Sequence, residues 1–298
     1  MIDDDRPARP RRSLLYVPAS NARALEKAQG LSADGLIVDL EDSVAPEAKT
    51  EAREAAMAAA RRGFGGCEVV IRCNRLDTPW GEADVAAAAD AGPDGVLVPK
   101  VRSAAEVEAY LRLLDRAPER TRLWLMVETP EGVLNLRDIV AAGAGGRLEA
   151  LVLGPNDLAD ELRLRGAGVR AALRPILSQM VLAARTAGLS ALGGVYNAFG
   201  DDAGLKAECA EEAGFGFDGK TLIHPRQIDI ANRAFSPSPE EIAWAKAVVA
   251  AFAVPDAAGK GAIRLDGRMI ERMHLTNAER ILALPAPAPN KKGWPGLG

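Results

Sequence analysis

The chain has 298 residues and a formal charge of −4, from 37 Lys and Arg against 41 Asp and Glu. A composition of 48% hydrophobic and 26% charged residues is that of an ordinary globular protein and argues against disorder, collagen and coiled coil. The mildly acidic balance, without a basic block, argues against a nucleic-acid binder. No apolar run approaches the ~18 residues of a membrane span. The charged start lacks the apolar core of a secretory signal, so we expect a cytoplasmic protein.

Cysteine and histidine usage restricts the kinds of site that the chain can hold. Cys67, Cys73 and Cys209 are odd in number and widely spaced, which predicts reduced thiols rather than a disulfide framework. His224 and His274 are the two histidines of the sequence, so a metal site built on three imidazoles is excluded. Any metal would therefore be held by carboxylates, which favours a hard ion such as Mg²⁺.

Short apolar runs alternate with Ala-rich stretches along most of the chain. Strands are predicted at residues 14–17, 35–40, 69–72, 95–100, 123–128, 150–154, 191–195 and 219–223. Helices are predicted at residues 22–29, 46–62, 81–91, 103–115, 132–142, 169–187 and 203–213. Continuous apolar runs indicate strands that are covered on both faces. Such strand–helix units most simply close into a (β/α)₈ barrel.

An open, doubly wound sheet is the competing architecture. Neither a GxGxxG after the first predicted strand nor a GxxxxGK[ST] is present, so nucleotide-binding folds lose support. We expect a flexible N-terminal tail over residues 1–11, the barrel over residues 12–235, and a C-terminal extension over residues 236–298. In that extension we expect a helix over 239–252, a hairpin over 259–267 that turns at Asp266-Gly267, a helix over 277–284 and a mobile tail.

Polar residues gather where the predicted strands end, which is where barrels of this kind carry their sites. Glu128 and Asp157 follow neighbouring strands, which lie ~4.8 Å apart, so both carboxylates could reach one ion. Two carboxylates completed by water and substrate oxygens are a usual Mg²⁺ site. The alternative is that both residues are helix caps or salt-bridge partners.

Arg72 ends the third apolar run and is expected in a partly closed mouth. A buried arginine must pair with a carboxylate or meet an anion. The structural alternative is an ion pair with Asp39, Glu41 or Asp42. His224, which precedes Pro225, is interpreted as a packed, hydrogen-bonded residue rather than a catalyst.

A series of motifs in the order of a known family runs from about residue 12 to residue 272. The motifs are RSLLYVP (12–18), VDLEDSV (38–44), IRCNRLDTPW (71–80), VPK (98–100), VETP (127–130), LGPNDL (153–158) and GFDGKTLIHPRQI (216–228). On these motifs the chain resembles the citrate lyase beta-subunit and acyl-CoA lyase family, which includes malyl-CoA and citramalyl-CoA lyases. The resemblance implies a Mg²⁺-dependent enzyme on a (β/α)₈ barrel.

The resemblance also implies roles for single residues and a class of substrate. Glu128 and Asp157 match the Mg²⁺ ligands and Arg72 matches the active-site arginine. Candidates for contacting the substrate or the phosphates of CoA are Arg12, Lys27, Lys100 and Asn156, and Asp42 is a further catalytic candidate. Family members cleave a 3-hydroxyacyl thioester, carried by CoA or by an acyl-carrier protein, to a smaller thioester and a 2-oxo acid. They are typically trimers or hexamers, so we expect a homo-oligomer.

Two departures from the family pattern bear on the chemistry. The family's GxMxD motif, whose Asp is its proposed general base, ends here in Glu271, and one added methylene displaces the carboxylate by ~1 Å, a shift that can cost about 10²-fold in rate. Gly193 stands where the seventh strand usually carries an Asp, which is expected to remove a carboxylate from the mouth. We expect Glu271 to take the proton-transfer role.

Four functions remain open on the sequence. The first is a stand-alone acyl-CoA lyase or thioester hydrolase. The second is the beta subunit of a citrate lyase complex that acts on a citryl-acyl-carrier protein. The third is a non-catalytic thioester-binding relative, and the fourth is a CoA-independent aldolase of small 2-oxo acids.

Overall fold

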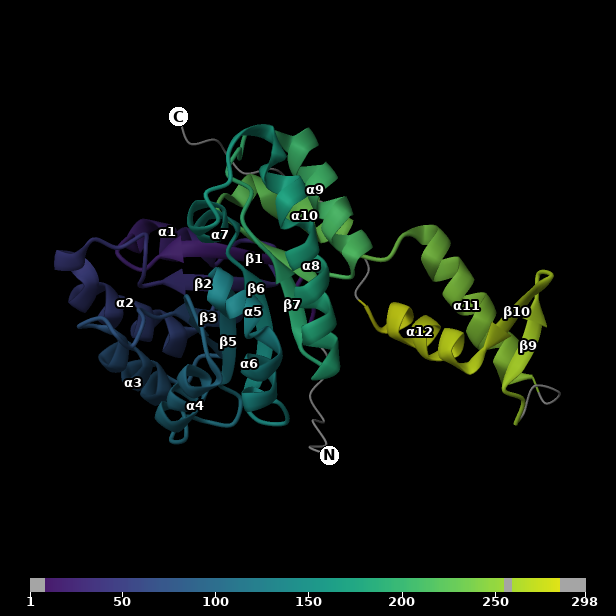
Figure 1. The fold of residues 1–298 in the computed structure, drawn as a ribbon, viewed down its shortest axis with the longest axis horizontal. Helices are drawn as coiled ribbons and strands as arrows, with labels where there is room; N and C mark the ends of the chain where they lie inside the picture. Colours follow the sequence, from purple (N-terminus) through teal and green to yellow (C-terminus); the bar gives the residue numbers. More distant parts are fainter. Residues whose placement is uncertain (1–8, 255–258, 285–298) are drawn as a thin grey trace.

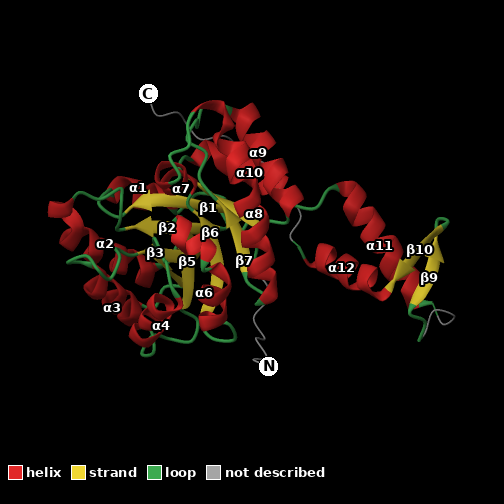
Figure 2. Ribbon diagram, in the orientation of Figure 1, coloured by secondary structure: helices red, strands yellow, loops and turns green. Residues whose placement is uncertain are grey.

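A computed structural model describes residues 9–254 and 259–284, and its centre is a closed barrel of eight parallel strands in the order β1 to β8. The barrel and its coat of helices are drawn in Figures 1 and 2. The pairing of β1 with β8 closes the sheet and excludes the open doubly wound alternative. The barrel strands are β1 Ser13–Pro18, β2 Gly35–Asp39, β3 Glu68–Arg72, β4 Gly95–Val98, β5 Arg122–Val127, β6 Leu148–Leu153, β7 Ser190–Gly193 and β8 Gly219–Leu222.

The helices between these strands cover the outside of the barrel. They are α1 Ala22–Ala28, α2 Lys49–Arg62, α3 Gly81–Ala91, α4 Ala104–Leu113, α5 Pro130–Leu134, α6 Leu136–Gly143, α7 Pro155–Glu161, α8 Val169–Thr186, α9 Asp202–Phe215 and α10 Ile228–Ala234. The predicted helix over 132–142 is in fact two helices, because Thr129 caps a first turn that begins at Pro130 and the chain bends at Asn135. The short helices α7 and α10 were not predicted.

Alternate residues of the strands point into the barrel and fill it. The interior cluster consists of Leu14, Ile37, Val70, Leu97, Trp124, Met126, Ala150, Val152 and Leu192, with Tyr16 packed against it. The outward-facing residues join the helices in a larger apolar core. Burial on both faces is why these strands read as continuous apolar runs.

The C-terminal extension is an arm with a small apolar core of its own. It consists of α11 Pro239–Ala253, β9 Ala262–Leu265, β10 Arg268–Glu271 and α12 Arg272–Ala283. Figure 1 shows the arm projecting away from the barrel. The predicted turn is confirmed, because Asp266 and Gly267 take φ values of 48° and 78° between β9 and β10. The last helix begins at Arg272 rather than at residue 277.

The predicted N-terminal tail is too long at its inner end. Arg11, placed in the tail by the sequence, lies at the N-terminal end of the barrel with its side chain largely buried. Its guanidinium donates to both oxygens of Glu68, at 2.9 and 2.7 Å, and lies 4.8 Å from the centroid of Trp124. Residues 1–8 of the predicted N-terminal tail, residues 255–258, and residues 285–298 of the predicted mobile tail lie outside the described residues. Across the part of the chain that the structure describes, no helix is long and apolar enough to cross a membrane.

Candidate active site

A cavity of about 300 Å³ opens at the C-terminal ends of the barrel strands. Its walls come from the ends of six strands and from the loops after them. The lining residues are Tyr16, Asp39, Asp42, Ser43, Arg72, Met126, Glu128, Leu153, Gly154, Pro155, Asn156, Asp157, Val195, Asn197, Thr221 and Ile223. The structure therefore brings together five of the predicted catalytic, metal-binding and substrate-binding residues, which are Asp42, Arg72, Glu128, Asn156 and Asp157.

Arg72 is buried at this cavity and meets three carboxylates. Its Nε and Nη2 donate to the two oxygens of Asp39 at 2.6 and 2.7 Å, and its Nη1 lies 2.8 Å from Glu41 Oε2. Asp42 Oδ2 is more distant, at 3.6 Å, on a largely exposed side chain. Burial works to raise the pKa of Asp39, but the charge and hydrogen bonds of Arg72 lower it overall. The ion pair considered on the sequence is thus present, and it holds the arginine at the cavity.

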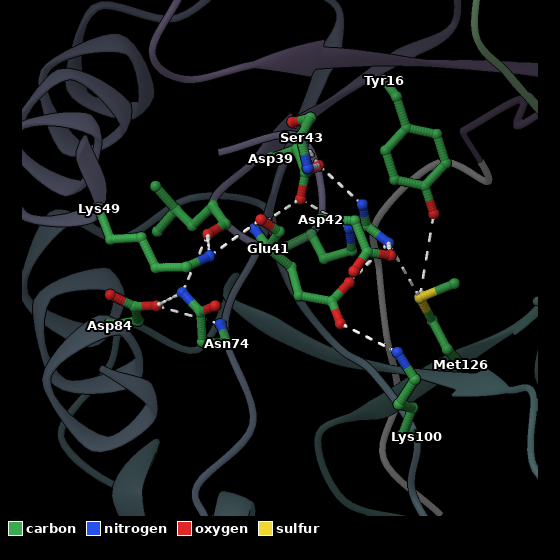
Figure 3. A network of polar contacts seen from close by, with 12 residues as sticks. Tyr16, Asp39, Glu41, Asp42, Ser43, Lys49, Asn74, Asp84, Lys100 and Met126 are labelled. Atoms are coloured by element: carbon green, nitrogen blue, oxygen red, sulfur yellow. Dashed lines mark hydrogen bonds and ion pairs between the residues drawn. The ribbon is translucent and has the colours of Figure 1, made fainter. Parts of the chain in front are cut away.

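The loop after β2 is held rigidly, which fixes the carboxylates that it carries (Figure 3). Asp39 accepts hydrogen bonds from the backbone of Glu41 at 2.9 Å and from the Ser43 hydroxyl at 2.6 Å. From α2, Lys49 Nζ donates to the carbonyls of Leu40 and Glu41, both at 2.9 Å. Lys49 was missed on the sequence, because a lysine at the start of a helix gives no sign that it reaches back to a loop.

Glu128 and Asp157 stand on either side of Lys100 at the mouth. Glu128 Oε1 accepts from the backbone amide of Lys100 at 2.7 Å, and Lys100 Nζ lies 3.0 Å from Asp157 Oδ1 and 3.4 Å from Glu41 Oε1. Lys100 takes a left-handed φ of 53°, which is uncommon without glycine and marks a constrained position. Gly154 lets the Glu128 carboxylate lie against its backbone, because a Cβ there would collide with that carboxylate.

The charges at the mouth do not balance. Five carboxylates face two cations in a set that we call the mouth cluster: Asp39, Glu41, Asp42, Glu128 and Asp157 with Arg72 and Lys100. Burial, and then the charges of Asp157 and Glu41, raise the pKa of Glu128 to about 8. A divalent cation between Glu128 and Asp157 would relieve this repulsion. In residues 9–254 and 259–284 no three His, Cys, Asp or Glu side chains form a ready-made metal site. Two carboxylates completed by water and substrate oxygens are enough for Mg²⁺, and Glu128 and Asp157 could supply them.

The remaining candidate residues have different surroundings. Asn156 exchanges hydrogen bonds with Asn197 at the rim, with Asn197 Nδ2 2.8 Å from Asn156 Oδ1. His224 Nδ1 accepts from the Arg226 backbone at 3.2 Å, and its ring stacks on Phe199. This is the packed, hydrogen-bonded histidine expected from the sequence, and burial followed by the charge of Arg226 lowers its pKa.

Two candidates for contacting CoA do not line the cavity. Arg12 precedes β1 at the N-terminal end of the barrel, where it pairs with Asp34 through Nε at 2.8 Å and donates to the Ser236 hydroxyl. The prediction that Arg12 contacts the phosphates is wrong, because the length of the barrel separates it from the cavity. Lys27 lies in the last turn of α1 and does not line the cavity.

Glu271 lies on the projecting arm, between β10 and α12, and does not line the cavity of its own chain. Figure 1 shows the junction of β10 and α12 away from the barrel. The Glu271 backbone amide donates to His274 Nδ1 at 3.0 Å, which caps the helix. The expected catalytic role of Glu271 therefore requires another copy of the chain or a movement of the arm.

The expectation that Gly193 removes a carboxylate from the mouth is wrong, because position 193 does not face the mouth. A side chain at this position would point outward to α9, because an added Cβ would collide with the carboxylate of Glu212. Behind the strand, Lys220 Nζ lies 2.7 Å from Glu208 and 3.0 Å from Glu212, and the burial of Lys220 and Glu212 is complete. We call the balanced set behind β7 and β8 the wall cluster: Lys220, Arg170, Arg174, Glu208, Glu211 and Glu212.

Tyr16 and Met126 line the floor of the cavity and were missed on the sequence. The signal was present, since Tyr16 lies two residues after Leu14 and Met126 two after Trp124, and both earlier residues fill the barrel interior. A period of two along a strand places such residues on the same interior face, one layer closer to the mouth.

Comparison with known proteins gives the family of the chain. Residues 12–225 match the model of the HpcH/HpaI aldolase/citrate lyase family. The chain belongs to this family. A (3S)-malyl-CoA thioesterase of Cereibacter sphaeroides is 46% identical over 277 residues, covering 93% of this chain and 95% of the relative. The citrate lyase subunit beta of Escherichia coli is 34% identical over 286 residues, covering 93% and 94%.

The solved structures include family members with magnesium. The protein CitE from Mycobacterium tuberculosis, in complex with magnesium, acetoacetate and coenzyme A, superposes with a TM-score of 0.74 at 32% identity, over 92% of this chain and 97% of CitE. The relatives thus include an enzyme named for hydrolysis and a subunit named for carbon–carbon cleavage. They assign an enzyme family to the chain, and the particular reaction is a separate question.

Proposed function

We propose that this chain hydrolyses a CoA thioester of the malyl-CoA type to CoA and the free hydroxy acid, with Mg²⁺ held by Glu128 and Asp157. The observation that carries the proposal is the surplus of carboxylates at a cavity that also holds Arg72, in a chain 46% identical to a (3S)-malyl-CoA thioesterase. The same residues would also serve the lyase reaction expected from the sequence. The likeness to citrate lyase subunit beta supports that second candidate.

The roles of the residues follow from their positions. When bound, Mg²⁺ would supply a Lewis acid that polarises an oxygen of the acyl group. Lys100 holds Asp157 through its ammonium group and Glu128 through its backbone amide, and so keeps both carboxylates at one place. Arg72, fixed by Asp39, would stabilise the negative charge that develops on the substrate oxygen. Asn156 and Asn197 would contact the thioester at the rim.

Glu271 is proposed as the base, contributed by the arm of a neighbouring copy in a homo-oligomer. In hydrolysis it would take the proton of the water that adds to the thioester carbonyl, and the carbon–sulfur bond would then break to release CoA as its thiol. In carbon–carbon cleavage the base would act on the hydroxyl proton instead. Either reaction needs a base, and the arm of one chain does not bring Glu271 to the cavity of the same chain.

The test of the function is a mass-spectrometric turnover assay with malyl-CoA, β-methylmalyl-CoA and citramalyl-CoA, each with Mg²⁺ and with EDTA. Free CoA with intact hydroxy acid is the expected result. A smaller acyl-CoA with a 2-oxo acid would establish the lyase instead. The absence of any product would contradict both and direct the next assay to the citryl-acyl-carrier protein and to the non-catalytic and CoA-independent alternatives.

The role of Glu271 is tested by mixing two inactive variants. Glu271→Gln is expected to lower turnover by about 10² or more, because it removes the base and keeps the shape. If the arm acts on a neighbour, refolding Glu271→Gln together with Glu128→Gln restores part of the activity, since some sites then combine an intact cavity with an intact arm. Full activity of Glu271→Gln alone would contradict the role.

A further inference from the structure

The Tyr16 hydroxyl is a half-buried polar group of the cavity with a very weak partner. Its oxygen lies 4.0 Å from the sulfur of Met126, and a thioether is a weak acceptor (Figure 3). The other two tyrosines of the sequence are better paired: Tyr110 accepts from the Leu76 amide at 3.3 Å and Tyr196 donates to Asp201 at 2.7 Å. A thioether uses little of the hydrogen-bonding capacity of a hydroxyl, so the Tyr16 hydroxyl can donate a stronger hydrogen bond to a ligand in the cavity.

The position of Tyr16 indicates what kind of ligand atom its hydroxyl could bind. Its ring lies against the Arg72 guanidinium, 4.8 Å from ring centroid to Cζ, and its hydroxyl points across the cavity floor towards Met126. Burial raises the pKa of Tyr16, so the phenol stays protonated and can donate a hydrogen bond. Met126 is unbranched and can yield to a ligand that approaches the hydroxyl.

The charges near Tyr16 favour a neutral oxygen over a carboxylate. Arg72, beside the Tyr16 ring, is paired with Asp39 and Glu41, so carboxylates outnumber cations near the floor. A hydroxyl or keto oxygen can accept from the phenol without bringing a further negative charge beside these carboxylates. The floor is therefore suited to the oxygenated carbon of a hydroxy acid or an oxo acid.

We propose that the Tyr16 hydroxyl donates a hydrogen bond to the 3-hydroxyl oxygen of the acyl group, or to the keto oxygen of the matching oxo acid. Tyr16 thereby selects oxygenated acyl groups over acyl groups that lack this oxygen. The assignment of the acyl group rests on the proposed function, whereas the preference for an oxygenated ligand can be measured without turnover.

The experiment compares Tyr16→Phe with the matched control Tyr110→Phe. With Mg²⁺ present, Tyr16→Phe is expected to lower kcat/KM for malyl-CoA about tenfold and to leave the inhibition constant of succinyl-CoA, which lacks the hydroxyl, within about twofold. The melting temperature of metal-free Tyr16→Phe should equal or exceed that of the wild type, because no strong hydrogen bond is lost. Tyr110→Phe should lower the melting temperature and leave the ratio between the two ligands unchanged.

A calorimetric titration with oxaloacetate and with succinate separates this proposal from the proposed function. If the wild type fails to turn over malyl-CoA, the proposed function fails, and the titration alone decides the role of Tyr16. Wild-type preference for oxaloacetate that Tyr16→Phe reduces about tenfold would support the proposal. Equal losses for both ligands, no change in either, or a wild type that does not prefer oxaloacetate would overturn it.

Discussion

The mouth cluster and the wall cluster are built from the same kinds of side chain, yet they are arranged for different purposes. In the wall cluster, three cations meet three carboxylates between β8, α8 and α9, and Lys220 is completely buried. The mouth cluster sets five carboxylates against two cations around a cavity of about 300 Å³. The wall cluster is balanced in charge and closed, whereas the mouth cluster carries excess negative charge and is open to a ligand.

This difference shows in how each cluster affects its own members. Burial works to lower the pKa of Lys220, but the charges of Glu212 and Glu208 raise it overall, so the lysine stays charged. At the mouth, burial and then the charges of Asp157 and Glu41 raise the pKa of Glu128 to about 8, because both disfavour its charged form. A charge imbalance that a protein maintains in a cavity indicates a site for a cation or substrate, whereas a buried balanced set indicates a part of the architecture.

The largest expected effect comes from removing one carboxylate of the unbalanced cluster. Glu128→Gln keeps the shape of the side chain but removes its charge, so we expect Mg²⁺-dependent turnover to fall about 10³-fold or more. The measurement is the initial rate over a Mg²⁺ titration, with Mg²⁺ affinity followed by calorimetry. An unchanged Mg²⁺ affinity would contradict the assignment of Glu128 as a ligand.

The same variant tests the electrostatic imbalance without any metal. The pKa of Glu128 in the folded protein, about 8, lies above the ordinary value of 4.5, so the folded state binds an extra proton between these values. The contribution of this group to the free energy of unfolding is therefore complete below the lower value and lost as the pH rises through the upper one. In EDTA, urea titrations should show this fall in the wild type and a smaller fall in Glu128→Gln. Identical pH profiles of the wild type and Glu128→Gln would contradict a raised pKa of Glu128.

The balanced cluster should respond in stability rather than in catalysis. Lys220→Met leaves the buried Glu212 with Arg170, 3.2 Å away, as its remaining cation, so the free energy of unfolding should fall, by up to about 3–5 kcal/mol. The double variant Lys220→Met with Glu212→Leu should recover part of this loss, because no unpaired charge remains. Urea unfolding and kcat per folded molecule are the measurements, and a large loss of kcat in a folded double variant would show that the wall cluster takes part in the reaction.

The smallest effect is expected at the exposed edge of the mouth cluster. Asp42 is 3.6 Å from Arg72 and its side chain is 61% exposed. Exposed ion pairs contribute about 0–1 kcal/mol, so Asp42→Asn should change stability by no more than this. Turnover should also stay within about fivefold, which the same mass-spectrometric assay can measure. A loss as large as that of Glu128→Gln would instead place Asp42 in the reaction, as the sequence first suggested.

Much of the barrel could be predicted because its strands are buried on both faces. Runs such as Val69–Ile71 are apolar throughout, and this pattern depends on the sequence alone. The break between α5 and α6 at Asn135 was missed, because the apolar pattern continues across it. The helix α12 begins five residues before its predicted start, because the Glu271–His274 cap has none of the usual Ser, Thr, Asp or Asn signal.

The strand-end residues Arg72, Glu128 and Asp157 could be predicted, because parallel strands of a barrel end at one face. Arg12 could not be placed correctly from its motif, since a motif does not say which end of a strand a flanking residue joins. Gly193 was assigned to the mouth for a similar reason. The direction of its missing side chain depends on how β7 packs against α9, and a strand of four residues gives little alternation from which to read it.

Gly193 also limits how this enzyme can be redesigned. An alanine there would press on Glu212 before it could reach any ligand, so the position offers no route to a new functional group in the cavity. Larger residues at Gly193 would strain the packing of β7 against α9. Val195 and Asn197, on the loop that follows, do line the cavity. A search for altered substrate range should therefore diversify these two positions and leave the glycine as it is.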